Sequence, residues 1–580
     1  MSRTKGTSAT RMKKHGFVSR TLIAGLCVAF SAGCSTTYHK NKVDKEMYAS
    51  ITEMQEQVFG EADDFSINTR YSNRDPKEIL ASELIQERME EGKLNLTLED
   101  ALKIAVEFSR EYQTEKENLY FAALRLSDTE YSFSNIFGLT GSPNIERESG
   151  GSIRGEAATQ ARVGRFMKSG GRVSATLAND LVRYLTGDPR RALANTLTVS
   201  LSQPLLRGAG RDIVSENLTQ GERSLVYAIR DYTFFQNEFA VGIVNDYFRL
   251  IGQKDTIRNN YKNYESNVVS RKRASERSLF MDAPIAKQLA IQSELQAKNR
   301  YISSVIQYLN SLDSFKVTLG IPLTVEVFLD DSALRELEAA GMQEIRLEAG
   351  DAFKIAVESH LNVLNEIDRF EDSKRKINVA ANDLLPGLDI DSSASLDWDK
   401  EENYREFNVD EVRANMGLTL DLPFDRWRER NDYRETLIRF ESEIRSLART
   451  LDLKRNQIEV GLRNLEGNRN IYQNNLLEVE NAKEREAEQK LRADAGQVNP
   501  QTLIDAQNDL IRAENALVTT LVNVLRDRLQ LRLDVGVIET SSENFWLQAQ
   551  ILAENATEPA AKELQPDVSG ELIPPEELFK

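Results

Sequence analysis

The sequence DALKIAVE at residues 100–107 returns as DAFKIAVE at residues 351–358, with seven of the eight positions identical. Further matching residues follow both copies in the same order, ending with Gly320 in the first copy and Gly536 in the second. A long segment that occurs twice predicts a duplicated structural unit. This duplication accounts for most of a chain of 580 residues, a length that would otherwise allow roughly three or four ordinary domains.

The composition excludes several classes of function. The formal net charge is −17, whereas nucleic-acid binding needs an excess of Lys and Arg, so no nucleic-acid partner is expected. The histidines are His15, His39 and His360, too few for a His-rich metal site, and no nucleophile–base arrangement is evident. We therefore expect no enzymatic activity, no cofactor and no metal site. A metal site built from carboxylates stays an alternative, but the carboxylates have no diagnostic spacing.

The first residues have the pattern of a secretory signal. Six basic residues and no acidic residue accompany an apolar stretch at 21–30, and small residues lead to Cys34. A Cys after Ala-Gly resembles the lipobox of bacterial lipoproteins, whose first mature residue is a Cys that carries acyl chains such as palmitate. Ser31 stands where Leu is usual. The alternative is an ordinary signal peptide followed by an incidental Cys.

Two segments of the second copy alternate strictly between apolar and polar residues, at 388–399 and at 415–422. Period two predicts strands. One apolar and one acidic face over about ten residues is typical of a transmembrane β-strand with lipid on one side and water on the other. A half-buried hairpin of a soluble sandwich has the same period. The signal peptide and the aromatic residues near the strand ends favour the membrane.

The first copy has more strand-like sequence at the corresponding place. Alternating segments occur at 131–139, 157–163, 173–177 and 197–201, and Gly170-Gly171 is a hairpin turn signal. We expect two barrel strands and one additional hairpin here. The sequence does not assign which segments form the additional hairpin.

Long proline-free runs follow the strands of each copy, at 205–283 and 424–499, and shorter helical runs begin at Pro284 and Pro500. Apolar residues of the second run keep steps of three, four and seven, which predicts a coiled-coil seam. About seventy helical residues are on the order of 100 Å long. Helices of this length are typical of a rod, a coiled coil or a tunnel. A shorter helix opens the first copy, with Thr97 as its expected N-cap.

These residues resemble the TolC-like family of outer membrane efflux proteins. The resemblance rests on short motifs in a specific order over residues 95–538: LTLEDA at 96–101, SQPLLRG at 202–208, LLPGL at 384–388, LPFD at 422–425, and AG at 495–496 followed by LIDAQ at 503–507. It implies a mainly α fold with a β-barrel portion. Each chain of a homotrimer would give four strands to a twelve-stranded transmembrane barrel, which a periplasmic α-helical barrel continues.

The resemblance also implies a function. The protein would be the outer membrane exit duct of a tripartite efflux or type I secretion system. Its partners would be outer membrane lipids, a periplasmic adaptor and an inner membrane transporter. An alternative from another class is a structural periplasmic coiled-coil lipoprotein that tethers the envelope.

Candidate functional residues follow from the strands and from the resemblance. Acidic residues on one strand face would line a water-filled pore, unless they only solvate that face: Asp389, Asp391, Asp397, Asp399 and Asp421. By resemblance, Asp505 would lie at a periplasmic gate, with Thr502 where a second acid is usual. Asp505 can instead complement the helix N-terminus near Pro500. The adaptor-contact tips, or simply solvated turns, would include Arg277, Leu279, Ala495 and Gly496.

The expected organisation of the chain follows. In order, it comprises a signal peptide at 1–33, a lipid-anchored N-terminal extension at 34–94, the first repeat at 95–322, a linker at 323–344, the second repeat at 345–538 and a C-terminal tail at 539–580. Prolines in the tail predict disorder at its end. Much of 35–93 is also expected to be disordered, apart from a possible helix at 76–91.

Overall fold

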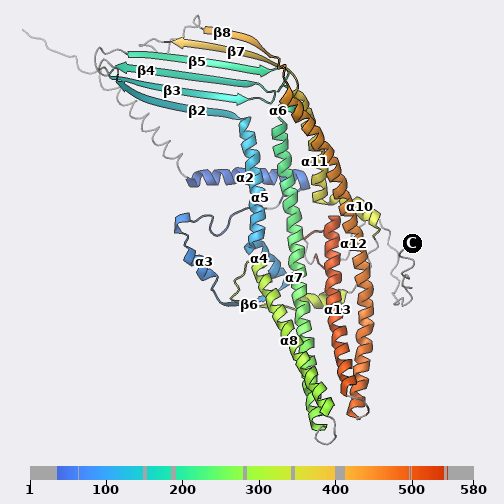
Figure 1. The fold of residues 1–580 in the computed structure, drawn as a ribbon. Coiled ribbons are helices and arrows are strands. Elements are labelled where there is room, and N and C mark those ends of the chain that lie inside the picture. The colour runs from blue at the N-terminus through green and yellow to red at the C-terminus, as the bar shows by residue number, and fades with distance from the viewer. Residues whose placement is uncertain are drawn as a thin grey trace, which may run out of the picture.

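The computed structural model shows a six-stranded sheet at one end of the molecule and two long helical hairpins that extend away from it (Figure 1). The residues it describes are 36–62, 64–147, 153–184, 191–277, 284–340, 347–398, 412–495, 497, 500–540 and 545–546. Cys34, Asp399, Leu279 and Gly496 lie outside these residues.

Strands and helices alternate in the same order in the two halves of the chain. The first half contains α4 (Leu98–Phe108), α5 (Arg110–Ser132), β2 (Asn135–Arg147), β3 (Ile153–Phe166), β4 (Arg172–Tyr184), β5 (Arg191–Pro204), α6 (Arg211–Val214), α7 (Glu216–Arg277) and α8 (Pro284–Leu319). The second contains α10 (Ala349–Ser359), α11 (Leu361–Asp383), β7 (Gly387–Trp398), β8 (Val412–Asp421), α12 (Trp427–Asp494) and α13 (Pro500–Val535). The short helices α4 and α10 have 11 residues each, and α8 and α13 have 36 each.

The helix signals in the sequence are confirmed. Thr97 caps α4, since its side chain accepts a hydrogen bond from the backbone N–H of Asp100. The helices α8 and α13 begin at Pro284 and Pro500, where proline's missing N–H costs no helical hydrogen bond. The two long helices, α7 and α12, have 62 and 68 residues.

In each half of the chain, a glycine that follows the last helix packs against a break between the first two helices. Ser109 breaks the helix between α4 and α5, and Gly320, just after α8, packs on this break. His360 breaks the helix between α10 and α11, and Gly536, just after α13, packs on it. Both glycines have positive φ, of 77° and 82°, and a Cβ on either would overlap the facing backbone. Glycine is therefore required at both places.

The main core lies midway along the molecule, between the sheet and the hairpin tips. Strands β1 (Gly92–Leu96) and β6 (Val325–Leu329) pair in parallel beside α4, α7 and α8. The hydroxyl of Tyr247, buried on α7, lies 2.9 Å from the carbonyl oxygens of both Leu96 and Asp330. The expected linker thus contains β6 and α9 (Ser332–Ala340), and the pairing of β1 with β6 joins the start of the first half to its end.

The N-terminal extension is more ordered than expected. Residues Thr36–Phe59 form the helix α2, whose Met47 and Ile51 are buried against α5 and α7, so the expectation of disorder there is wrong. Within 76–91 the structure has a single 3-10 turn, Pro76–Glu78, and the seven-residue helix α3, Ala81–Glu87, rather than one continuous helix.

The beginning of the C-terminal tail also packs on the core. Phe545 and Trp546 are buried, and Arg532 donates a hydrogen bond to the carbonyl of Phe545 at 3.2 Å. Among the described residues, no helix combines the length and the apolar character needed to cross a membrane.

Candidate functional site: a two-faced sheet continued by helical hairpins

The six strands form one antiparallel sheet in the order β2-β3-β4-β5-β7-β8. Residues Met167–Gly171 join β3 to β4 in a tight turn, with the backbone N–H of Met167 donating to the carbonyl of Gly171 at 2.8 Å. The hairpin predicted at Gly170-Gly171 is thereby confirmed. The segments predicted from period two at 157–163, 173–177, 197–201 and 388–398 are strands of this sheet, and so are most of those at 131–139 and 415–422. The start of the first was predicted wrongly, because Tyr131 and Ser132 are the last residues of α5 and β2 begins at Asn135.

The strand register separates a mainly polar face from a mainly apolar one, although Thr159, Asn179 and Asn195 form a polar row on the apolar side. One row of aligned residues on the polar face is Gly138, Arg162, Thr176, Thr198, Ser395 and Arg413. The adjacent row on the other face is Leu139, Ala161, Leu177, Leu197, Leu396 and Val412. Such alternation from the first strand to the last suits a wall with water on one side and apolar surroundings on the other.

The sheet curls toward its polar face. A hollow of about 620 Å³ lies there, lined by residues of all six strands, among them Gly138, Arg162, Ser174, Ser200, Asp391 and Asn415. Hydrogen bonds link neighbouring strands across this face: Ser174 and Ser200 share one at 2.7 Å, and Thr196 donates to Asp397 at 2.8 Å. The concave side is therefore the hydrophilic one.

Four of the five predicted pore-lining aspartates lie together on this polar face, and Asp399 lies outside the described residues. Asp389, Asp391 and Asp397 are on β7, and Asp421 ends β8 opposite Gly387. Asp421 accepts a hydrogen bond from Arg207 at 3.0 Å, and Asp397 is 3.7 Å from Arg413. Arginines thus offset part of the acidic charge on this face, which sequence alternation alone did not reveal.

The two predicted tip residues that the structure describes, Arg277 and Ala495, lie where the long helices α7 and α12 end, far from the sheet (Figure 1). Arg277 is the last residue of α7, and Ala495 is the C-cap of α12. Asp505 and Thr502 lie near the start of α13, exposed, and Asp505 accepts a hydrogen bond from Gln501 at 2.8 Å. This contact within one helix is compatible with both roles considered for Asp505.

Asparagines join the two hairpins. Asn259 on α7 donates to Asn515 on α13 at 3.0 Å, and Asn263 donates to Asn508 at 3.3 Å. Arg300 on α8 also donates to Asn508, at 2.9 Å. Sequence reasoning missed these contacts. A usable signal was the four-residue spacing of Asn259, Asn263 and Asn267, which places three amides on one helical face.

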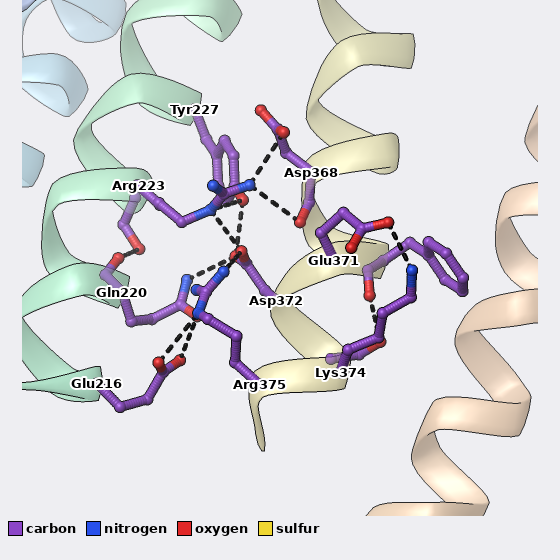
Figure 2. A network of polar contacts seen from close by, with 12 residues as sticks. Glu216, Gln220, Arg223, Tyr227, Asp368, Glu371, Asp372, Lys374 and Arg375 are labelled. Carbon is purple, nitrogen blue, oxygen red and sulfur yellow. Dashed lines mark hydrogen bonds and ion pairs between the residues drawn. The ribbon is translucent and has the colours of Figure 1, made fainter. Parts of the chain in front are cut away.

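A buried carboxylate links the upper parts of α7 and α11 (Figure 2). The side chain of Asp372 on α11 is only 3% exposed and lies 2.5 Å from Nε of Arg223 and 2.9 Å from Nη1 of Arg375. The Tyr227 hydroxyl donates to it at 2.6 Å, and Gln220 donates at 3.1 Å. The network joins a helix of the first half to a helix of the second.

The electrostatics of this cluster favour an ionised Asp372. Burial by itself opposes ionisation, but hydrogen bonds from Tyr227 and Gln220 and the charges of Arg223 and Arg375 outweigh it and lower the pKa of Asp372. Burial, together with the hydrogen bond to Asp372, raises the pKa of Tyr227 to about 12. A usable sequence signal was the spacing of four and seven residues, which places polar side chains on one face of a helix. This spacing occurs on both helices: Arg223, Tyr227 and Arg230 on α7, and Asp368, Asp372 and Arg375 on α11.

No group of three or more His, Cys, Asp or Glu side chains suited to a metal ion occurs within the part of the chain that the structure describes. The arrangement therefore offers a two-faced wall, long hairpins and charged cross-links between helices.

Comparisons with solved structures identify this architecture. The CmeC outer membrane channel of Campylobacter jejuni superposes with a TM-score of 0.55 at 13% identity, over 77% of this chain and 87% of that one. VceC, an outer membrane protein of Vibrio cholerae, gives 0.55 at 13% identity, over 76% and 96%. The chain has the TolC-like channel fold.

The TolC-like likeness is one of fold and not of sequence. The MtrE outer membrane channel of Neisseria gonorrhoeae, solved in its open state, matches with a TM-score of 0.52 at 10% identity, over 76% of this chain and 89% of that one. No family model matches the chain, and no curated protein sequence does. In this TolC-like chain the sheet has six strands, two more than the four per chain that the sequence resemblance implies.

Proposed function

We propose that the protein is an exit duct of the outer membrane, through which solutes leave the periplasm passively. The observation that carries this proposal is the concave sheet with one mainly polar and one mainly apolar face, extended by two helical hairpins. An apolar outer face suits lipid, and a polar concave face suits water. The proposal includes no catalytic step and no cofactor.

The complete duct consists of three copies of the chain. One sheet has two edge strands, β2 and β8, whose outer backbone groups would find no water within a bilayer, so the sheet must close against further copies. The matching order of elements supports the duplication at 95–322 and 345–538, and so do the equal lengths of α4 and α10 and of α8 and α13. Helices from both halves would then alternate around a periplasmic tunnel.

The hairpin tips and the acidic faces have distinct roles in this proposal. Arg277, Leu279, Ala495 and Gly496 belong to the tips, where a periplasmic adaptor would dock and connect the duct to an inner membrane transporter. Asp389, Asp391, Asp397, Asp399 and Asp421 would line the pore wall and favour cations. Acylated Cys34 would anchor the mature N-terminus in the membrane.

The central experiment is reconstitution of the detergent-extracted protein into planar bilayers. We expect a trimer whose gel mobility changes on heating and which forms discrete channels. A protein that is monomeric, conducts no ions and washes off the membrane once the lipid anchor is removed would instead be the structural coiled-coil lipoprotein.

Asp505 is proposed to constrict the periplasmic end of the tunnel. The variant Asp505→Ala should raise the single-channel conductance, because it removes one negative charge per chain from the constriction. Glu514→Ala, on the same helix but farther from the tip, is the control and should leave the conductance unchanged. Equal conductance of Asp505→Ala and the native protein would leave Asp505 only its interaction with the helix N-terminus.

A further inference from the structure

The two strands beyond the expected four are integral to the sheet. β3 and β4 lie between β2 and β5, and each pairs along its length with a neighbour on either side. Thirteen residue pairs join β3 to β2 on one side of the hairpin, and twelve join β4 to β5 on the other. Removing this hairpin from the wall would therefore break two complete hydrogen-bond ladders.

The turn of the β3–β4 hairpin packs tightly against the C-terminal end of β5. A Cβ on Gly170 would lie 2.5 Å from the carbonyl oxygen of Gly208 and 3.0 Å from Cγ of Pro204. The amide of Gln203 donates to the carbonyl of Ser169 at 3.1 Å, and Ser169 donates back to Gln203 at 3.0 Å. The turn thus sits at the helical end of the sheet, continuous with the β5–α6 connection.

The faces of β3 and β4 match those of the other strands. Arg162 and Thr176 belong to the polar row, and Ala161 and Leu177 to the adjacent apolar row. Residues of both strands also line the hollow on the concave face. The hairpin has the same two environments as β5, β7 and β8, so it is a part of the wall rather than a plug or an outer flap.

The two edges of the sheet are complementary to each other. β2 leaves α5 and runs away from the helices, whereas β8 runs back toward α12, so β2 of one copy can pair antiparallel with β8 of the next. Apolar side chains of these edge strands are the more exposed ones: Leu139 is 73% and Met416 74% exposed, against 42% for Leu177 on the inner strand β4. A neighbouring copy would cover them. A head-to-tail contact of this kind closes into a ring.

We propose that β2 and β8 are the subunit interface of an eighteen-stranded barrel, to which each of three copies contributes all six strands. This inference rests on the proposed duct. Because barrel diameter grows nearly linearly with strand number, the wall would be about 1.5-fold wider than a twelve-stranded one. Walls of this size enclose an open aqueous channel. The size limit for cargo therefore lies in the helical tunnel and not in the barrel.

Strand counting by electron cryomicroscopy of the purified trimer in lipid nanodiscs tests this proposal. The matched variant lacks residues 153–184, which removes β3, the turn and β4 and joins 148–152 to 185–190. We expect eighteen strands in the native barrel and twelve in the variant, with the diameter falling to about two thirds. A native trimer with a twelve-stranded wall, or with β3 and β4 outside the wall, overturns the inference and leaves the duct itself intact.

Disulfide cross-linking gives a second measurement that needs no deletion. Leu139→Cys on β2 is combined in turn with Ala414→Cys, Met416→Cys and Leu418→Cys on β8, to sample the register. At least one pair should give covalently linked subunits on non-reducing gels, and each single-Cys variant should give none. Leu177→Cys on β4 with the same partners is the control. Linkage from β4 in place of β2 contradicts the interface, and a protein that is monomeric throughout contradicts the proposed function as well.

Discussion

At the scale of single residues, two glycines let the end of each half of the chain pack closely against a helix break near the start of the same half. Gly320 and Gly536 occupy corresponding positions, and each packs against a helix break, at Phe108–Ser109 and at Ser359–His360. The sequence showed the pair as matching positions of a repeat. The reason for the match is steric, because backbone from another segment occupies the space in which a side chain would lie.

Substitution of these glycines should be more costly than substitution of a glycine with similar φ in open space. We expect Gly320→Ala to lower the unfolding temperature well below that of Gly208→Ala. Both have positive φ, 77° and 74°, which costs an Ala about 1–2 kcal/mol, but a Cβ on Gly208 meets nothing within 4 Å. Thermal unfolding of the two purified variants measures the difference. Equal losses for the two variants would mean that the contact with Phe108 is unimportant.

The buried His360 makes stability depend on pH. Burial, followed by the charge of Lys454, whose Nζ is 3.1 Å from Nε2, lowers the pKa of His360 to about 4 from its ordinary 6.5. The unfolded chain takes up a proton below pH 6.5 and the folded chain does not, so stability is lost as the pH falls from about 6.5 to 4. The loss is about 2–3 kcal/mol.

The test compares unfolding temperatures of the native protein and of His360→Gln between pH 7 and pH 4.5. We expect the difference in unfolding temperature between the two proteins to shrink as the pH falls. Only the native chain loses stability at low pH by keeping a buried imidazole neutral. The exposed His39 provides the control, and His39→Gln should follow the native curve. A difference that stays constant with pH would contradict the assignment.

At the scale of elements, the helices α7 and α11 are joined by a carboxylate shared between two arginines. Arg223 and Arg375 both lie within ion-pair distance of Asp372, and Arg375 also bonds Glu216 at 3.0 Å. Replacing a buried member of such a cluster leaves its partners without their counter-charge, which is costly. Pairs on the helix surface contribute little by comparison.

Asp372→Asn should therefore destabilise the folded protein by about 2–3 kcal/mol, less than a fully buried pair would lose, because both arginines are partly exposed. The neighbouring Glu371→Gln breaks only an exposed pair with Lys374, 2.7 Å apart, and should cost about 0.5 kcal/mol or less. Denaturant unfolding followed by circular dichroism compares them. Similar midpoints for the two variants would show that burial adds nothing to the Asp372 cluster.

At the scale of the whole molecule, the proposed duct would be held in the membrane in two independent ways, by the apolar face of the sheet and by the proposed lipid anchor. Cys34→Ser removes the proposed acylation site, but the apolar face of the sheet remains. We expect this variant to stay in the outer membrane fraction after washing with high salt or carbonate. The proposed duct requires this outcome, because a barrel in lipid needs no anchor. Release as a soluble protein would favour the structural lipoprotein.

Much of the fold was readable from local pattern. Period two marked the strands, proline marked the starts of α8 and α13, and Thr97 marked the start of α4, because each of these signals reflects the backbone geometry of a few neighbouring residues. The helix α2 was missed, since its burial depends on only Met47, Ile51 and Gln55 and its own sequence is not strongly amphipathic. The cross-links at Asp372 and at the asparagines were missed for a related reason, namely that each requires two distant helices.

The sequence by itself determined the order of the helices and strands that the two halves share, and the two faces of the sheet, because these depend on periodicities within single segments. Only the tertiary structure decided how many strands join one sheet, which side is concave and which helices meet. The four alternating segments of the first half could not reveal whether all belong to the wall. Strand pairing answers that question, since hydrogen bonds between β2, β3, β4 and β5 are contacts between segments and leave no local trace in the sequence.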